Sequence, residues 1–371
     1  MLCGLASLLL TYWIVRREAG RPAAALACGL LACGATQLMV CQLARSYTLL
    51  QLLVTAQTAL LLSRQPPSMS RLLLSAVLSA GALFTHGAAL VAIPAQIAAV
   101  AVALPRRWRY VLSGAAGSLL YWVFLLTHPT LDNVEVHLDW VPPPTTTALL
   151  RFPALLQFGR YVDQVPPALQ ALAVLCFVLL GIAALVHSDQ AAYLALQSFF
   201  TWSLAAAAGG WGIIGVERYF APALLCQAAF SAIALTGLTS QLRWLSWLSG
   251  GLAAALSIGS AGLYAALPPF APWREMAALV EARRSADETV IVVSPEVLAT
   301  PFAYYYRGEA TFGGERGIEL SETRRGLWVC FRDPSLEATG RISAQSEQFR
   351  LGPPDVYRFH RGAVWHYRPT D

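Results

Sequence analysis

The residues best suited to chemistry stand at the ends of apolar segments. Arg45 and Tyr47 open one segment, Arg218 and Tyr219 open another, and His86 interrupts a third. A guanidinium pairs bidentately with phosphate oxygens, a tyrosine hydroxyl donates a hydrogen bond, and an imidazole accepts a proton. Each has a structural alternative: arginine at a span end reaches for the membrane interface, tyrosine joins the aromatic belt, and histidine forms a hydrogen-bonded turn.

Acidic residues that could act as a proton acceptor are scarce in the apolar part. Glu217 and Asp132 are candidates, and Asp139 lies in the same loop as Asp132. Glu217 has the alternative of pairing only with its neighbour Arg218. We therefore assign no catalytic residue and keep Glu217, His86 and Asp132 as candidates.

The composition divides the chain into two parts. Hydrophobic residues make up 56% of 371 positions and charged residues 13%, but residues 1–270 hold 13 arginines and 7 acids, whereas residues 271–371 hold 13 arginines and 14 acids. The net charge of +5 thus lies between apolar segments instead of on a clustered basic surface, which argues against nucleic-acid binding. We predict a membrane domain over 1–270 and a soluble domain over 271–371.

The seven cysteines indicate neither a metal site nor a disulfide framework. They have no metal-ligand spacing, and six of them lie inside apolar runs, where cysteine behaves as a small hydrophobe. The chain contains no lysine, which is typical of a GC-rich bacterial genome.

Ten apolar stretches predict membrane-spanning helices, since a crossing needs about 20 apolar residues with every backbone group paired. They are 1–15, 22–44, 48–63, 72–84, 87–104, 110–127, 168–186, 191–208, 219–238 and 244–266. The run 72–104 is split at His86, because only then do the four short basic loops face the cytoplasm together. Those loops carry Arg16, Arg17 and Arg21; Arg64 and Arg71; Arg106, Arg107 and Arg109; and Arg243.

The polar groups that could take part in a reaction then lie on the opposite, exoplasmic face. They are the Arg45–Tyr47 segment, the turn at His86, the long loop 128–167, the segment 209–218 and the C-terminal domain. Met1 would begin abruptly on this face, so we expect that an upstream segment precedes it.

The C-terminal part predicts a small α/β domain with a short parallel core. Helical periodicity covers 272–284 and 296–306, buried-strand patterns cover 287–293 and 327–331, and 356–359 with 363–367 alternate like a hairpin. It has no glycine-rich phosphate loop, nucleophile elbow or His/Cys cluster, so we expect a supporting role as a lid or acceptor platform.

The ordered motifs resemble glycosyltransferase family 39, membrane enzymes with the GT-C fold that use sugars on polyprenyl or dolichyl phosphate. The matching segments, spread from residue 16 to residue 290, are Arg16–Arg21, Ala44–Leu50, Thr85-His86, Trp140-Val141-Pro142, Arg218–Pro222, Trp273-Arg274 and Asp287–Val290. The resemblance implies a polytopic helical membrane protein of the bacterial inner membrane. It also implies that Arg45, Tyr47, Arg218 and Tyr219 bind the phosphate or lipid of a polyprenyl-phosphate sugar, which is transferred to a glycan, lipid or protein acceptor on the exoplasmic side.

Two departures from the family pattern concern the catalytic acid. The family carries one acid in the first exoplasmic loop, which this chain lacks together with the N-terminal span. A second acid usually stands two residues before the motif arginine, where this chain has Leu43. We therefore expect the chain as given to be inactive, or to be a non-catalytic protein that binds a lipid or a partner.

A transporter is the third alternative. The absence of internal repeats and the near absence of ionisable groups inside the spans argue against it. No cofactor is evident; a divalent cation is compatible with a phosphate donor, but no exoplasmic acid cluster indicates a metal site.

Overall fold

The computed structural model divides into two compact units, Met1–Ala266 and Leu267–Asp371, which we describe separately. It describes residues 2–42, 46–127, 151–207, 220–237, 243–266, 273–285, 287–293, 302, 305–308, 310–313, 326–332, 342–344, 347, 351–359 and 362–369.

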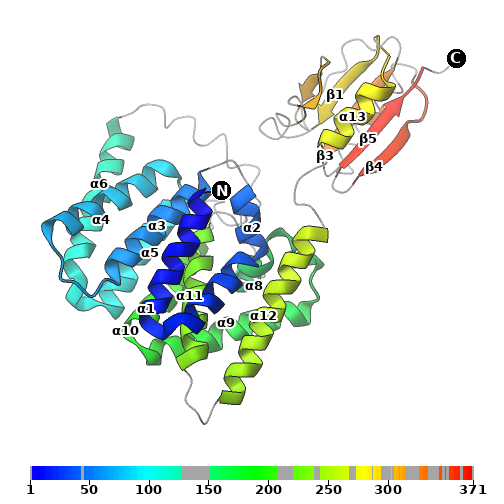
Figure 1. Cartoon of the computed structure of the whole chain (residues 1–371). Coiled ribbons are helices and arrows are strands. Elements are labelled where there is room, and N and C mark those ends of the chain that lie inside the picture. The colour runs from blue at the N-terminus through cyan, green and yellow to red at the C-terminus, as the bar shows by residue number, and fades with distance from the viewer. Residues whose placement is uncertain are drawn as a thin grey trace. The chain divides into compact units, whose positions relative to one another are not determined.

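The first unit is a bundle of apolar helices (Figure 1). They are α1 (Leu2–Ala32), α2 (Ala35–Gln42), α3 (Tyr47–Leu61), α4 (Met69–Thr85), α5 (Ala89–Ala103), α6 (Trp108–Thr127), α8 (Phe152–Phe158), α9 (Pro167–His187), α10 (Asp189–Ala207), α11 (Ala221–Gly237) and α12 (Arg243–Ala266). Each of the ten predicted spans falls on a helix of this bundle.

α1 contains two helices joined at a tight turn. Gly20 at the turn has φ of 85°, a left-handed conformation that glycine adopts without steric cost. The Cys28 thiol then lies 3.4 Å from the Leu8 carbonyl oxygen, so the second helix runs back along the first. This confirms the predicted loop between the segments 1–15 and 22–44.

The predicted break at His86 is also confirmed. α4 ends at Thr85 and α5 begins at Ala89. The Thr85 hydroxyl donates to the Gly81 carbonyl, and Nδ1 of His86 accepts the Ala88 N–H at 3.0 Å. Local hydrogen bonds thus end one helix and start the next.

The prediction of one continuous span over 22–44 is wrong. The helix breaks at Cys33-Gly34, and α2 leaves at 71°. The Ser260 hydroxyl of α12 accepts the Ala35 N–H at 2.8 Å and donates to the Gln157 carbonyl at 2.7 Å. A hydroxyl from a helix far along the chain therefore accepts the hydrogen bond of a backbone N–H that has no partner within α2.

The reading of 128–167 as a loop is wrong for its described end. Residues Phe152–Phe158 form α8, and Gly159–Gln164 form the 3₁₀ helix η4. Leu156, Phe158 and Tyr161 are buried. The Gln170 amide of α9 donates to the Val162 and Val165 carbonyls, both at 2.7 Å, and so fixes this segment against the bundle.

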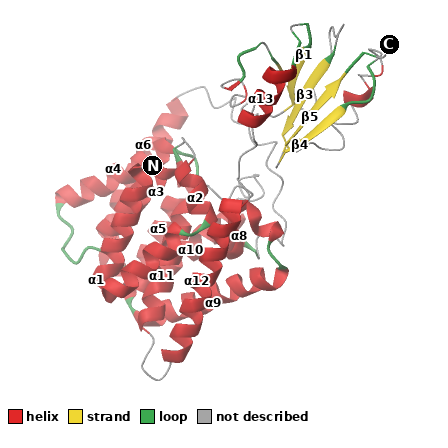
Figure 2. Cartoon of the chain, turned by 45° about the vertical axis from the view of Figure 1, so that its right-hand side comes forward, coloured by secondary structure: helices red, strands yellow, loops and turns green. Residues whose placement is uncertain are grey.

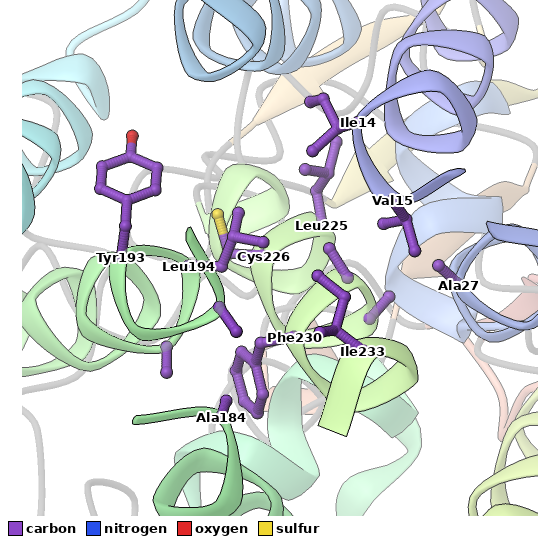
Figure 3. Close-up of a cluster of buried hydrophobic side chains, with 14 of the residues drawn as sticks. Ile14, Val15, Ala27, Ala184, Tyr193, Leu194, Leu225, Cys226, Phe230 and Ile233 are labelled. Carbon is purple, nitrogen blue, oxygen red and sulfur yellow. The ribbon is translucent and has the colours of Figure 1, made fainter. Parts of the chain in front are cut away.

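α11 is the central helix of the unit. Nearly all of its side chains are buried, and it packs against α1, α3, α9, α10 and α12. Figure 3 shows Leu225, Cys226, Phe230 and Ile233 of α11 among side chains of α1, α9 and α10. A helix that is apolar all round is expected at such a position.

Three of the predicted basic loops lie at one end of the bundle. The Arg107 guanidinium donates to the Gln65 carbonyl at 2.8 Å and to the Ser63 carbonyl, and Arg71 donates to the Ser63 hydroxyl. Glu18, in the loop of Arg16, Arg17 and Arg21, lies within electrostatic range of Arg64. The three loops lie at the same end of the bundle, which supports the prediction that they face the same side of the membrane. That this side is the cytoplasm stays a prediction.

Two described helical stretches, Pro105–Thr127 and Pro167–His187, are long and apolar enough to cross a membrane by themselves, or three if the bent pair of α1 and α2 counts as one. Five further described apolar helices are shorter, at 10–17 residues: Tyr47–Leu61, Met69–Thr85, Ala89–Ala103, Ala221–Gly237 and Gly250–Ala266.

The second unit is a five-stranded sheet with the order β2-β1-β3-β5-β4 and one described long helix, α13 (Trp273–Arg283) (Figure 2). The strands are β1 (Thr289–Val293), β2 (Thr311–Gly313), β3 (Leu327–Arg332), β4 (Asp355–Phe359) and β5 (Gly362–Tyr367). β1 pairs in parallel with β2 and β3, and β5 pairs antiparallel with β3 and β4.

The strands of this sheet alternate between two apolar faces. Val290 and Val292 pack with Met276 of α13, whereas Ile291 packs on the opposite face with Val329 and Phe331. The predicted parallel core, first helix and hairpin are therefore confirmed. The predicted helix 296–306 lies mostly outside the described residues, although Tyr306 N–H bonds the Phe302 carbonyl in helical register.

Candidate functional site

Two predicted site residues, Tyr47 and His86, lie against each other. Their ring centroids are 4.7 Å apart with an interplanar angle of 49°. Tyr47 is buried at the first turn of α3, and His86 is held in the α4–α5 turn by its bond from the Ala88 N–H. Because the ring of Tyr47 is packed in place, its orientation is fixed before any ligand arrives.

The head of α11 meets the same place. Tyr47 packs with Val40 of α2 and Ala221, the first residue of α11. One turn deeper, the Gln51 amide donates to the Gln37 side-chain oxygen at 2.7 Å and to the Ala221 carbonyl at 3.4 Å. The heads of α3 and α11, the end of α2 and the α4–α5 turn thus converge at one end of the bundle.

This convergence lies opposite the basic loops. α3 and α4 each connect the Tyr47–His86 end of the bundle with the end that carries the basic loops. α3 does so from Tyr47 to Leu61, and α4 from Thr85 back to Met69. At about 1.5 Å of rise per residue, the two ends are separated by roughly 20 Å. Tyr47 and His86 therefore lie at the opposite end of the unit from the arginine-rich loops, as the charge pattern predicts.

The remaining predicted site residues lie outside the described residues. They are Arg45, Arg218, Tyr219, Glu217 and Asp132, together with Asp139 and Leu43. In the sequence, Arg45 precedes Tyr47 by two positions and Arg218 precedes Ala221 by three. Their proposed roles remain predictions.

A buried seam of amides and hydroxyls lies beneath the site, and the sequence analysis missed it. The Gln96 amide of α5 donates to the Val54 carbonyl at 3.1 Å and the Thr58 hydroxyl at 2.9 Å. Gln51, Thr55 and Thr58 are all buried, and their spacing places them on one face of α3. That spacing was the available signal, since polar residues on one helical face of an apolar span indicate interhelical hydrogen bonding.

A second missed cluster lies in the sheet unit around the buried Glu288. Its Oε2 accepts the Trp328 indole N–H and the Ser285 N–H, both at 2.8 Å, and its Oε1 lies 2.8 Å from Nε2 of His366. The His366 ring stacks on Trp328 with centroids 3.9 Å apart. Burial alone raises the pKa of the Glu288 carboxyl, but the hydrogen bonds from Trp328, Ser285 and His366 outweigh it and leave the pKa lowered.

The described residues contain no group of three or more His, Cys, Asp or Glu side chains that could hold a metal ion. The pairing of Glu288 with His366 supplies two such groups only.

No family profile matches the chain, and no curated protein sequence matches it either. Among solved structures, apo ArnT from Cupriavidus metallidurans superposes with a TM-score of 0.60 at 13% identity, over 98% of this chain and 82% of that one. The same protein bound to undecaprenyl phosphate gives 0.56 at 13% identity with the same coverage. The mycobacterial arabinofuranosyltransferase AftD gives 0.48 at 14% identity over 33% of its length, which is too low to support an argument.

The fold of ArnT thus extends over both units of this chain, from the helical bundle to the small sheet. The chain is a polytopic α-helical membrane protein with the GT-C fold and a C-terminal sheet domain.

Proposed function

We propose that the chain is a membrane glycosyltransferase that uses a polyprenyl-phosphate-linked sugar. The observation that carries the proposal is the convergence of α3, α11 and the α4–α5 turn around Tyr47 in a chain with the fold of ArnT. One of the ArnT structures contains undecaprenyl phosphate, which motivates the choice of donor lipid.

The site chemistry follows from the residue types at these three places. During transfer, the bond between the sugar C1 and the donor phosphate oxygen breaks, a bond from C1 to the acceptor oxygen forms, and polyprenyl phosphate leaves. Arg45 and Arg218 are proposed to bind the leaving phosphate, because guanidinium groups stabilise developing phosphate charge through paired hydrogen bonds. Tyr47 and Tyr219 are proposed to position the lipid phosphate.

Three residues are candidates for taking up the acceptor's proton. His86 contacts the ring of Tyr47, but its Nδ1 accepts the Ala88 N–H, which places the ring proton of the neutral imidazole on Nε2. Nε2 is then a donor, so His86 could take up a proton only on Nδ1, by giving up the Ala88 bond. Glu217 and Asp132 remain candidates on sequence grounds. We further propose that the site and the sheet unit face the exoplasm of a bacterial inner membrane.

The experiment is a turnover assay on the purified full-length chain. A membrane extract containing polyprenyl-phosphate sugars serves as donor, and release of free undecaprenyl phosphate is followed by mass spectrometry. Release by the wild type that is lost in Arg45→Ala and kept in Arg64→Ala, at the opposite end of the bundle, would support the transferase. No release by the wild type would instead agree with the expectation, based on Leu43, that the chain as given is inactive. Repeating the assay with and without EDTA tests the requirement for a divalent cation.

A non-catalytic lipid-binding protein is the second candidate, and one observation favours it. Leu43 stands where the resembling family usually has an acid, and leucine cannot take up a proton. Binding of undecaprenyl phosphate without any turnover, unchanged when acceptor extracts from several bacteria are added, would select this second candidate.

A further inference from the structure

An open groove of about 370 Å³ runs between α4 and α6 at the end of the bundle that carries the basic loops. Its walls include Met69, Leu73, Ala76, Trp108, Leu112 and Ala116. Met69, Leu73 and Leu112 expose 80%, 65% and 59% of their surface, so the groove opens to the outside of the helical unit. In a membrane protein such a face is covered by hydrocarbon.

Close packing of the two helices closes the groove at its deeper end. A side-chain carbon at Gly117 of α6 would lie 2.2 Å from the Ala76 carbonyl oxygen of α4, so the backbones touch there. Small residues allow this approach between membrane helices. The groove therefore extends from Met69 to Ala76, about 10 Å along α4 at about 1.5 Å per residue.

The mouth of the groove is positively charged. Arg109 lines it, with its guanidinium 5.8 Å from the Trp108 ring centroid, and Arg106 is exposed on the preceding turn. Neither guanidinium forms an ion pair or a hydrogen bond with any residue that the structure describes. By contrast, the Arg107 guanidinium donates hydrogen bonds to the Ser63 and Gln65 carbonyls. An unpaired guanidinium beside an apolar groove complements a lipid with an anionic headgroup.

We propose that this groove binds one acyl chain of an anionic phospholipid from the surrounding bilayer, with the lipid phosphate on Arg109. Trp108 at the rim would lie at the level of the headgroups, where tryptophan is enriched. Zwitterionic and anionic phospholipids both carry a phosphate, but only the anionic headgroup has a net negative charge. That charge beside Arg109 favours the anionic lipid, and the apolar walls hold its chain.

The occupant is distinct from the proposed sugar donor. Leu72 and His86 lie at opposite ends of α4, about 20 Å apart at about 1.5 Å of rise per residue. One phosphate cannot reach both Arg109 and the Tyr47–His86 pair. The proposal therefore stands or fails independently of the glycosyltransferase proposal.

The test is native mass spectrometry of the full-length chain titrated with phosphatidylglycerol or phosphatidylcholine of identical acyl chains. We expect one phosphatidylglycerol to bind at a concentration that leaves phosphatidylcholine unbound. Arg109→Gln should lower the preference for phosphatidylglycerol roughly fivefold, the effect expected for one arginine near an anionic lipid. Arg64→Gln, an exposed arginine outside the groove, serves as the control.

A second pair of variants tests the groove itself. Ala116→Trp fills it and should reduce retention of phosphatidylglycerol, whereas Ala115→Trp, on the neighbouring exposed position, should not. The proposal would be overturned if the two phospholipids bound equally, or if the two tryptophan variants had equal effects. Displacement of the lipid by undecaprenyl phosphate, or a dimer in place of the lipid adduct, would also overturn it.

Discussion

Removing the Glu288 carboxylate should open the sheet unit locally. In Glu288→Ala the indole N–H of the fully buried Trp328 and the ring nitrogen of His366 lose their partner. A buried polar group left unsatisfied costs about 1–3 kcal/mol, so two of them amount to about 3 kcal/mol. Since about 1.4 kcal/mol corresponds to a factor of ten, amide exchange in β3 and β5 should accelerate roughly 150-fold.

Hydrogen exchange of the full-length chain, read by mass spectrometry on peptides covering 327–332 and 362–367, measures this change. Glu288→Gln is the matched control, because its amide oxygen keeps the Trp328 and Ser285 bonds while its NH₂ faces His366. We expect Glu288→Gln to change exchange much less than Glu288→Ala. Exchange in Glu288→Ala that stays within threefold of the wild type would refute the reasoning.

The pH dependence of the same peptides provides an independent check. The Glu288 carboxyl has a lowered pKa in the folded protein, so the unfolded chain binds a proton more readily. The stabilisation that the Glu288 carboxylate gives the folded sheet unit is complete above the ordinary pKa of 4.5 and is lost as pH falls through the lowered pKa. Glu288→Gln should remove this acid-dependent loss, and an unchanged acid profile would contradict the assignment.

Three further predictions concern the helical unit and its orientation. Gly117→Val should destabilise the helical unit by about 1–3 kcal/mol through overpacking against α4, and so lower its thermal unfolding temperature in detergent, whereas Gly181→Val, with open space around it, should not. Gln96→Leu removes two bonds to α3 at about 0.6 kcal/mol each and should lower that temperature only slightly. In intact cells an impermeant maleimide should label Asp355→Cys but not Gln65→Cys, and the reverse pattern would invert the proposed topology.

The helices were largely predictable because their signals are local. The turn at Gly20 and the break at His86 follow from apolar length and arginine placement, and the structure has both. The bend before α2 was not predictable, since the Ala35 N–H is satisfied by Ser260, which lies 225 positions further along the chain. Local sequence does not reveal a cap supplied from so far away.

The candidate site was predictable in part. Tyr47 and His86 were singled out by their positions at segment ends, and the structure brings them into ring contact. The Glu288 cluster was missed because Glu288, Trp328 and His366 come from three separate strands or strand ends, and only the parallel and antiparallel pairing of β1, β3 and β5 brings them together. The buried seam on α3 had a visible spacing, but its partner Gln96 follows only from helix packing.

The most direct test of the central claim is the affinity of the purified full-length chain for undecaprenyl phosphate. Hydrogen bonds to charged groups contribute about 1.5–3 kcal/mol, so Arg45→Ala and Arg218→Ala should each weaken binding by about 10- to 150-fold. Arg64→Ala, at the other end of the bundle, should leave it unchanged. Equal affinities in all four proteins would contradict a polyprenyl-phosphate site at the heads of α3 and α11.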